Sequence, residues 1–318
     1  MISTSENWVE KIRAGDVRAI SRAITCIENH EPEAEEILRQ LFPQTGKAYL
    51  IGITGSPGTG KSTLVDRLAS HYRKQQLPVG IVAVDPSSPF SGGAILGDRI
   101  RMQGHATDDG IFIRSMATRG FLGGLARTTA DVALLLDAAG KRVVLVETVG
   151  VGQDEVDIVK LADCTLVVLM PGTGDEVQAI KAGIMEIGDI FVLNKADREG
   201  ADRFEQEVTA MLSLAPERDG RRPPVVRTVA TEDKGTSNVA AAIEKFRAHF
   251  ESAGRRNVKN VERWKQRLLE LLQARLMEYV VSHGIGEATL AALANDVARR
   301  TKDPYSAVSE ILARAGLK

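Results

Sequence analysis

The sequence predicts an α/β fold in which a mostly parallel sheet is covered by helices on both faces. From residue 47 to about residue 252, short apolar stretches alternate with amphipathic stretches of helical spacing. Several stretches, such as residues 143–146, are apolar throughout, which is typical of strands buried on both faces. With 43% hydrophobic and 26% charged residues, the 318-residue chain has the composition of a globular protein with one large core, with or without satellites.

Seven strands are expected in this region. Ligands of parallel sheets bind at the carboxyl ends of the strands, so the loops that follow the strands should carry the chemistry. We therefore expect one sheet domain over residues 47–254. The expected strands are residues 48–53, 79–84, 111–114, 143–147, 165–170, 189–193 and 225–229.

Helices are expected on both sides of this domain in the sequence. Residues 1–46 form a helical N-terminal extension, in which Gly15-Asp16 ends the first helix and caps the second. Residues 255–318 contain a long helix and two shorter ones, at about 286–301 and 303–315. The long helix carries much apolar surface, so we expect 255–318 to be a dimerisation arm of a two-fold homodimer; the alternative is that it folds back on its own sheet domain.

Charge and hydropathy argue against several classes of partner. The net charge is −1 with both signs interspersed, which gives no broad basic footprint for nucleic acid or anionic membranes. The longest apolar stretches, such as 166–170, are far too short to span a membrane, and the polar start is not a secretory signal. We expect a cytoplasmic protein, or one in a matrix compartment if a transit peptide was removed.

The stretch Gly55-Ser56-Pro57-Gly58-Thr59-Gly60-Lys61-Ser62-Thr63 matches the phosphate-binding pattern G-x-x-x-x-G-K-[ST] without exception. Its glycines let the backbone aim N–H groups at phosphate oxygens, and a helix starting at Lys61 adds the positive end of its dipole. The Lys61 ammonium should reach the outer phosphates, and the Ser62 hydroxyl should bind the bridging magnesium ion. An apolar strand precedes the motif, so the sheet should have the P-loop NTPase fold.

Carboxylates follow two other strands and are candidate magnesium ligands. Glu147 ends a strand and Gly150 comes three positions later; in P-loop NTPases such an acid anchors magnesium and such a glycine senses the terminal phosphate. Asp85 and Asp98 lie in a proline- and glycine-rich loop after the second strand, and we place them near magnesium, directly or through water. The alternative is that Asp85 caps a turn before Pro86 and Asp98 caps a helix.

The residue after Gly150 is Val151, where Ras-like enzymes have the glutamine that orients the attacking water. Gln153 and Asp154 lie a little further along the chain. Intrinsic hydrolysis should therefore be slow unless a partner or another loop supplies the missing group.

The sequence Asn194-Lys195-Ala196-Asp197 follows another strand and matches N-K-x-D, which selects guanine. A carboxylate at Asp197 accepts hydrogen bonds from the ring N–H and the exocyclic amine of guanine, donors that adenine does not offer in that arrangement. Lys195 should lie along the face of the base, and Asn194 should tie this loop to the P-loop. After the last strand, the backbone N–H of Ala230 is our candidate for contact with the guanine oxygen.

The segment at residues 171–181 joins a glycine-containing loop to a helix, and its Gln178 and Lys181 lie off the core face. A simple GTPase does not need such a segment, so we interpret it as a mobile switch that transmits nucleotide state. The alternative is an ordinary solvated helix.

The whole chain resembles the MeaB/ArgK family, the bacterial relatives of the human methylmalonic aciduria type A protein. The resemblance depends on the P-loop, D-P-S-S-P from Asp85, E-T-V-G-V-G-Q from Glu147, N-K-A-D from Asn194 and Q-A-I-K from Gln178, in this order. It implies a homodimeric, GTP-hydrolysing chaperone that gates cofactor loading of an adenosylcobalamin-dependent acyl-CoA mutase, most simply of the methylmalonyl-CoA mutase type, and protects that mutase.

Residue roles also follow from this resemblance. It implies the catalytic residues Lys61, Glu147, Asp98 and Arg101, and a signalling group of Asp175, Gln178 and Lys181. The cofactors would be GTP or GDP with Mg²⁺. Because the chain lacks the cobalamin signature D-x-H-x-x-G, cobalamin should belong to the partner mutase.

Two other functions are alternatives to this one. A metallochaperone GTPase for nickel or cobalt shares the superfamily, but the five histidines are scattered and the cysteines Cys26 and Cys164 are isolated, so it lacks a ligand set. A transport-associated ATPase or kinase is disfavoured by the N-K-A-D sequence, which argues against ATP.

Overall fold

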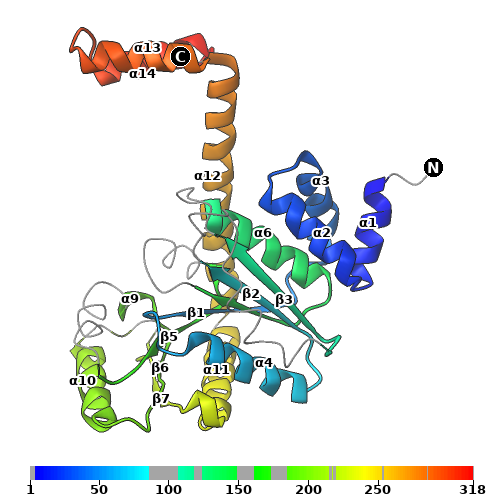
Figure 1. The fold of residues 1–318 in the computed structure, drawn as a ribbon, viewed down its shortest axis with the longest axis vertical. Coiled ribbons are helices and arrows are strands. Elements are labelled where there is room, and N and C mark those ends of the chain that lie inside the picture. Colours follow the sequence, from blue (N-terminus) through cyan, green and yellow to red (C-terminus); the bar gives the residue numbers. More distant parts are fainter. Residues whose placement is uncertain are drawn as a thin grey trace. The chain divides into compact units, whose positions relative to one another are not determined.

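A seven-stranded parallel sheet lies at the centre of the first of two compact units, Met1–Phe250 (Figure 1). The computed structural model describes residues 4–85, 107–117, 124–148, 161–172, 185–214, 217, 220–252, 254–284 and 286–317. The strand order in the described part is β3-β2-β4-β1-β5-β6-β7, and every pairing is parallel. The strands are β1 (Tyr49–Thr54), β2 (Val79–Asp85), β3 (Ile111–Ala117), β4 (Val143–Glu147), β5 (Cys164–Leu169), β6 (Ile190–Leu193) and β7 (Val225–Arg227).

These strands are the seven expected from the sequence, with ends shifted by at most three residues. The largest extension is in β3, which continues to Ala117 because its register with β2 persists as far as the pair Asp85 and Ala117. The α/β class and the parallel sheet are therefore confirmed.

Helices cover both faces of the sheet (Figure 1). On one face, Val144 and Val146 of β4 pack in a core shared with α6 (Gly124–Ala138) and the N-terminal helices. On the other face, Leu145 packs in a core shared with α4 (Lys61–Lys74) and α11 (Thr236–Ser252). Helix α10 (Ala201–Leu214) covers β5 and β6 on the same face as α6, because it packs on Val167, Leu169, Phe191 and Leu193, which alternate with the residues of the α4 and α11 core. The remaining elements of this unit are α1 (Thr4–Arg13), α2 (Val17–Glu28), α3 (Pro32–Leu41), η1 (Phe42–Gln44), α9 (Met185–Ile187) and η4 (Ala230–Glu232).

The N-terminal helices pack on the sheet domain through α6. Asp16 caps α2 by accepting a hydrogen bond from the Ala19 N–H at 2.7 Å. Asp137 of α6 accepts hydrogen bonds from the N–H groups of residues 46–48, with 2.9 Å to Ala48. Burial raises the pKa of Asp137, and the three N–H donors oppose that shift. This carboxylate therefore joins the end of the helical extension to the start of β1.

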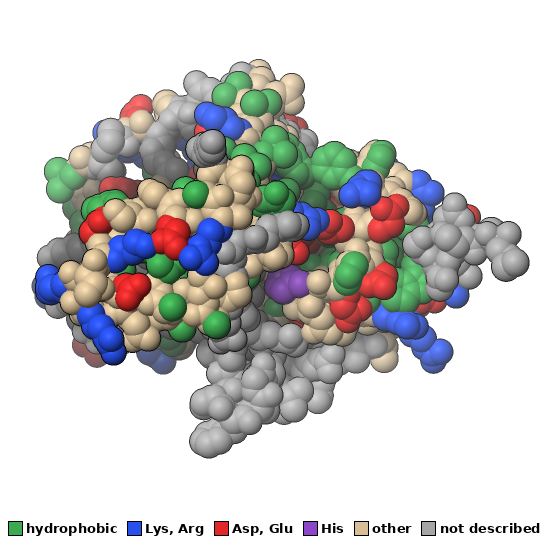
Figure 2. Space-filling view, turned by 90° about the horizontal axis from the view of Figure 1, so that it is seen from above, with side chains coloured by type: hydrophobic (Ala, Val, Ile, Leu, Met, Phe, Trp, Pro, Cys, Tyr) green, Lys and Arg blue, Asp and Glu red, His purple; other side chains and the backbone are tan. Residues whose placement is uncertain are grey.

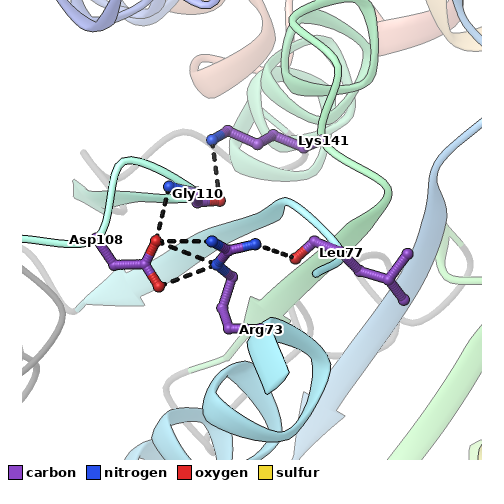
Figure 3. A network of polar contacts seen from close by, with 5 residues as sticks. All are labelled: Arg73, Leu77, Asp108, Gly110 and Lys141. Carbon is purple, nitrogen blue, oxygen red and sulfur yellow. Dashed lines mark hydrogen bonds and ion pairs between the residues drawn. The ribbon is translucent and has the colours of Figure 1, made fainter. Parts of the chain in front are cut away.

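A polar network ties three turns together at the amino end of the sheet (Figure 3). Arg73, near the end of α4, donates to both carboxylate oxygens of Asp108 and to the Leu77 carbonyl at 3.1 Å. Lys141 donates to the Gly110 carbonyl, also at 3.1 Å, and the Gly110 N–H donates to Asp108. Burial is the main cause that lowers the pKa of Lys141. The network lies at the end of the sheet opposite to the predicted nucleotide loops.

The second unit, Glu251–Lys318, is helical. It contains α12 (Arg255–Gly284), α13 (Glu287–Ala298) and α14 (Pro304–Arg314), and α14 packs against both other helices. Asp303 caps α14 through the Ser306 N–H at 2.9 Å, as its position before Pro304 predicts. Many large apolar side chains of this unit are exposed, including Val258, Val261, Trp264, Leu268, Leu272, Met277 and Tyr305.

The described surface carries both signs of charge. In the face shown in Figure 2, Lys and Arg side chains lie beside Asp and Glu side chains. Ion pairs of this kind include those that Arg227, at the end of β7, forms with Asp202 and Glu205 of α10. Within the described ranges, none of the helices is both long and apolar enough to cross a membrane.

Candidate functional site

The loop between β1 and α4 has a backbone that only glycine fits at two points. Gly55 has φ +138°, and a Cβ there would lie 2.1 Å from the Val168 carbonyl oxygen. Gly60 has φ +93°, and a Cβ there would lie 2.4 Å from Nδ2 of Asn194. Both positions are glycines of the phosphate-binding motif, so this loop passes close to β5 and to the predicted guanine loop.

Lys61 begins α4, as predicted, and its ammonium lies within the loop. Its side chain is 6% exposed, and Nζ donates to the carbonyl oxygens of Gly55 at 2.7 Å and Ser56 at 3.1 Å. Thr59 closes the same turn by donating its hydroxyl hydrogen to the Ser56 carbonyl at 2.9 Å. A buried positive charge among loop carbonyls is well placed to neutralise phosphate oxygens bound by this loop.

Ser62 and Glu147 bring two oxygen ligands together. The Ser62 hydroxyl donates to Oε1 of Glu147 at 2.7 Å, and Glu147 is 4% exposed at the end of β4. Magnesium is bound by few protein oxygens together with phosphate and water, so a hydroxyl beside one buried carboxylate fits this ion. The two residues that the sequence assigns to magnesium from separate motifs are thus adjacent.

Asn194 connects the predicted guanine loop with the P-loop, as expected. It is 2% exposed and donates from Nδ2 to the Thr59 carbonyl at 2.7 Å. Its Oδ1 accepts from the Thr228 hydroxyl at 3.0 Å and from the Ala230 N–H at 3.1 Å. One amide side chain therefore joins the loops after β1, β6 and β7.

Lys195 and Asp197 lie in the turn after β6. Lys195 adopts φ +55° and donates from Nζ to the Gly58 carbonyl at 2.7 Å, so its side chain crosses toward the P-loop. Asp197 is exposed, so a base stacked beside Lys195 would have to displace water from this carboxylate.

The backbone N–H of Ala230, our candidate donor to the guanine oxygen, already has a partner within the protein. This N–H donates to Asn194, so a guanine oxygen would have to share this N–H or meet a neighbouring one. Two residues outside the recognised motifs also support this loop: Thr228 bonds Asn194, and Arg67 of α4 donates to the carbonyls of Ala230 and Thr231. Neither belongs to a pattern that the sequence could reveal.

Several predicted residues lie outside the described part of the structure. Of Asp85 only the backbone is described, as the last residue of β2. The others that lie outside are Asp98, Arg101, Gly150, Asp175, Gln178 and Lys181. Their assignments therefore stay predictions.

Histidines, cysteines and carboxylates are the side chains from which a further metal site could be built. In those ranges, no group of three or more His, Cys, Asp or Glu side chains could hold a metal ion. Cys26 and Cys164 are buried free thiols, and burial raises the pKa of Cys26 to about 11.

A parallel sheet with a phosphate-binding sequence motif after its first strand, a buried carboxylate beside the Ser62 hydroxyl at the end of β4 and an N-K-x-D loop after β6 defines a P-loop GTPase. The chain belongs to the MeaB family: the family described as "Methylmalonyl Co-A mutase-associated GTPase MeaB" matches residues 20–284. The family confirms the resemblance found in the sequence and identifies the chain as a guanine-nucleotide-binding GTPase.

Individual relatives agree with this assignment. A putative GTPase of Pyrococcus abyssi is 50% identical over 96% of this chain and 95% of its own. The mitochondrial methylmalonic aciduria type A homolog of Mus musculus is 31% identical over 87% of this chain and 72% of its own. A crystal structure described as an LAO/AO transport system kinase has a TM-score of 0.74 at 24% identity, covering 97% of this chain and 96% of that one, and shows the shared fold.

Proposed function

We propose that this GTPase is a chaperone of an adenosylcobalamin-dependent acyl-CoA mutase, of the methylmalonyl-CoA mutase type. In this role it gates cofactor loading and protects or reactivates the mutase. The observation that carries the proposal is the match of residues 20–284 to a family described as mutase-associated. The name of the mouse relative, which refers to methylmalonic aciduria, supports the same client.

The nucleotide site supplies the switch for this role. The P-loop residues 55–63 and Gly150 bind the phosphates of GTP or GDP, while Asn194, Lys195, Asp197 and the turn at Ala230 bind the base. The contacts of Asn194 join these two parts of the site, so base and phosphates are read by one connected structure.

Magnesium is held by Ser62 and Glu147, with Asp85 and Asp98 acting directly or through water. The ion, when bound, neutralises charge that develops on the transferred phosphoryl group. Lys61 supplies a second positive charge there, and we assign Asp98 and Arg101 to the same catalytic group.

Hydrolysis is slow without a partner, because Val151 stands where a water-orienting glutamine would be. Asp175, Gln178 and Lys181 transmit nucleotide state to the mutase.

Cobalamin is bound by the mutase and not by this chain. The protein acts in the cytoplasm.

The helical unit is the proposed dimerisation arm, over residues 255–318, beside a G domain over 47–254 and the N-terminal extension over 1–46. Its exposed apolar side chains, among them Leu268 and Leu272, support this proposal because a repeated apolar surface is commonly covered by a second copy across a two-fold axis.

The test is co-purification with candidate acyl-CoA mutases in the presence of GTP or GDP, together with GTP turnover. We expect one mutase to bind and to accelerate hydrolysis. If no candidate mutase binds or stimulates, the chaperone proposal is wrong. Lys181→Ala should leave GDP affinity largely intact and reduce the mutase-stimulated turnover. Stoichiometric nickel binding would instead favour a metallochaperone.

A further inference from the structure

Arg67 joins the P-loop helix to the base loop, at a contact that no nucleotide motif includes. It lies six positions after Lys61 on α4 and is half-buried. Its Nε donates to the Ala230 carbonyl at 3.0 Å, and a terminal nitrogen donates to the Thr231 carbonyl at 3.3 Å. The fork of the guanidinium therefore meets two successive carbonyl groups of η4.

This turn is held from the opposite side by Asn194. The Ala230 N–H donates to Asn194 Oδ1, while the Ala230 carbonyl accepts from Arg67. Val229 and Lys234 close the base of the turn through paired backbone hydrogen bonds of 3.0 and 3.2 Å. Each peptide unit is planar, so fixing a carbonyl also fixes the direction of the N–H of the next residue.

We propose that Arg67 is a positioning residue for guanine recognition. By holding the Ala230 carbonyl, it directs the Thr231 N–H of the same peptide plane at the 6-oxygen of the base, and its second contact, with the Thr231 carbonyl, steadies the turn. The inference rests on the proposed binding of guanine by the loops after β6 and β7. It adds a link from the phosphate-binding helix to the base loop that acts independently of Asn194.

The chemistry of the side chain favours this role over simple packing. A guanidinium presents several donors in a rigid plane and keeps its charge, so it holds two acceptors in a fixed geometry. A lysine at the same place offers one flexible point charge. Methionine keeps an unbranched apolar stem and removes all the donors, so it separates packing from hydrogen bonding.

The experiment compares two nucleotides on wild type, Arg67→Met and Arg67→Lys. GDP carries the 6-oxygen, whereas 2-aminopurine riboside diphosphate lacks that oxygen and the ring N–H but retains the exocyclic amine that donates to Asp197. The missing ring N–H weakens the analogue equally in wild type and variants, so the comparison between proteins isolates the 6-oxygen. We expect Arg67→Met to lower GDP affinity about tenfold and analogue affinity less than about threefold, because only the contact with the 6-oxygen is disturbed. Arg67→Lys should lie between wild type and Arg67→Met.

Arg73→Met is the matched control, since Arg73 lies on the same helix but bonds Asp108 and Leu77 at the other end of the sheet. It should lower the melting temperature and leave the ratio of the two affinities unchanged. Equal losses for GDP and the analogue in Arg67→Met, or no loss in either variant of Arg67, would overturn the inference. If wild type itself does not prefer GDP to the analogue and to ADP, the proposed recognition of guanine is wrong, and the inference about Arg67 is wrong with it.

Discussion

Asn194→Ala is the substitution that tests the connection between the nucleotide loops most sharply. The buried amide makes three hydrogen bonds, to the Thr59 carbonyl, the Thr228 hydroxyl and the Ala230 N–H. Alanine leaves all three of those groups without this partner. The P-loop and the base loop then lose the side chain that fixes their separation.

The size of the effect follows from these contacts. A buried polar group that loses its hydrogen bond costs about 1–3 kcal/mol, and such costs are not additive. We therefore expect a total loss of about 2–4 kcal/mol, shared between folding and nucleotide binding. If about 2 kcal/mol of this loss falls on the free energy of GDP binding, GDP affinity falls about 30-fold.

The assay is titration of a fluorescent GDP analogue, with the melting temperature measured with and without GDP. Asp189→Ala is the control. Asp189 precedes the first residue of β6, whereas Asn194 follows the last, and it accepts a hydrogen bond from the Thr165 N–H at 2.9 Å. The control should lose stability but keep GDP affinity. If Asn194→Ala binds GDP within about threefold of wild type while remaining folded, the reasoning about this connection is wrong.

Three further predictions concern the metal, the helical extension and pH. Ser62→Ala should abolish most of the gain in GTP affinity that magnesium provides, and a magnesium titration of GTP binding checks this; an unchanged gain counts against the assignment. Asp137→Ala should lower the free energy of unfolding by about 2–3 kcal/mol in urea, since it strands three backbone N–H groups, and an unaltered urea midpoint would contradict this. Burial lowers the pKa of Lys141, so folding disfavours its charged form. The stability of wild type relative to Lys141→Met should therefore rise as the pH approaches the ordinary lysine value of about 10.4, and urea unfolding at several pH values should show a slope and not a constant difference.

The elements with strong local signals could be predicted from the sequence. The apolar run at 143–146 predicts a strand buried on both faces, and β4 is buried along its whole length, with alternate residues in the cores on the two faces of the sheet. The motif at 55–63 predicts the loop and the start of α4. Its glycines allow the positive φ angles that the tight loop needs, and Lys61 is the first residue of the helix. The proximity of Asn194 to the P-loop also follows, since parallel strands end at one edge of the sheet.

Other contacts could not be predicted because their signals are not local. Arg67 occupies an off-core position of an amphipathic helix, where an arginine is ordinarily solvated. Asp137 lies in an otherwise apolar stretch of α6, and only the fold brings residues 46–48 to its carboxylate. The contact of the Ala230 N–H with Asn194 likewise depends on how β7 is placed beside β6.

The central claim is that the turn at Asp197, joined to the P-loop through Asn194, reads guanine. Asp197→Asn replaces a carboxylate that accepts from the exocyclic amine of guanine with an amide that can donate to the 2-oxygen of xanthine. The direct measurement is the ratio of XDP to GDP affinity in wild type and in this variant. We predict that wild type prefers GDP and that Asp197→Asn prefers XDP; a variant that keeps the wild-type preference would show that the base is read elsewhere.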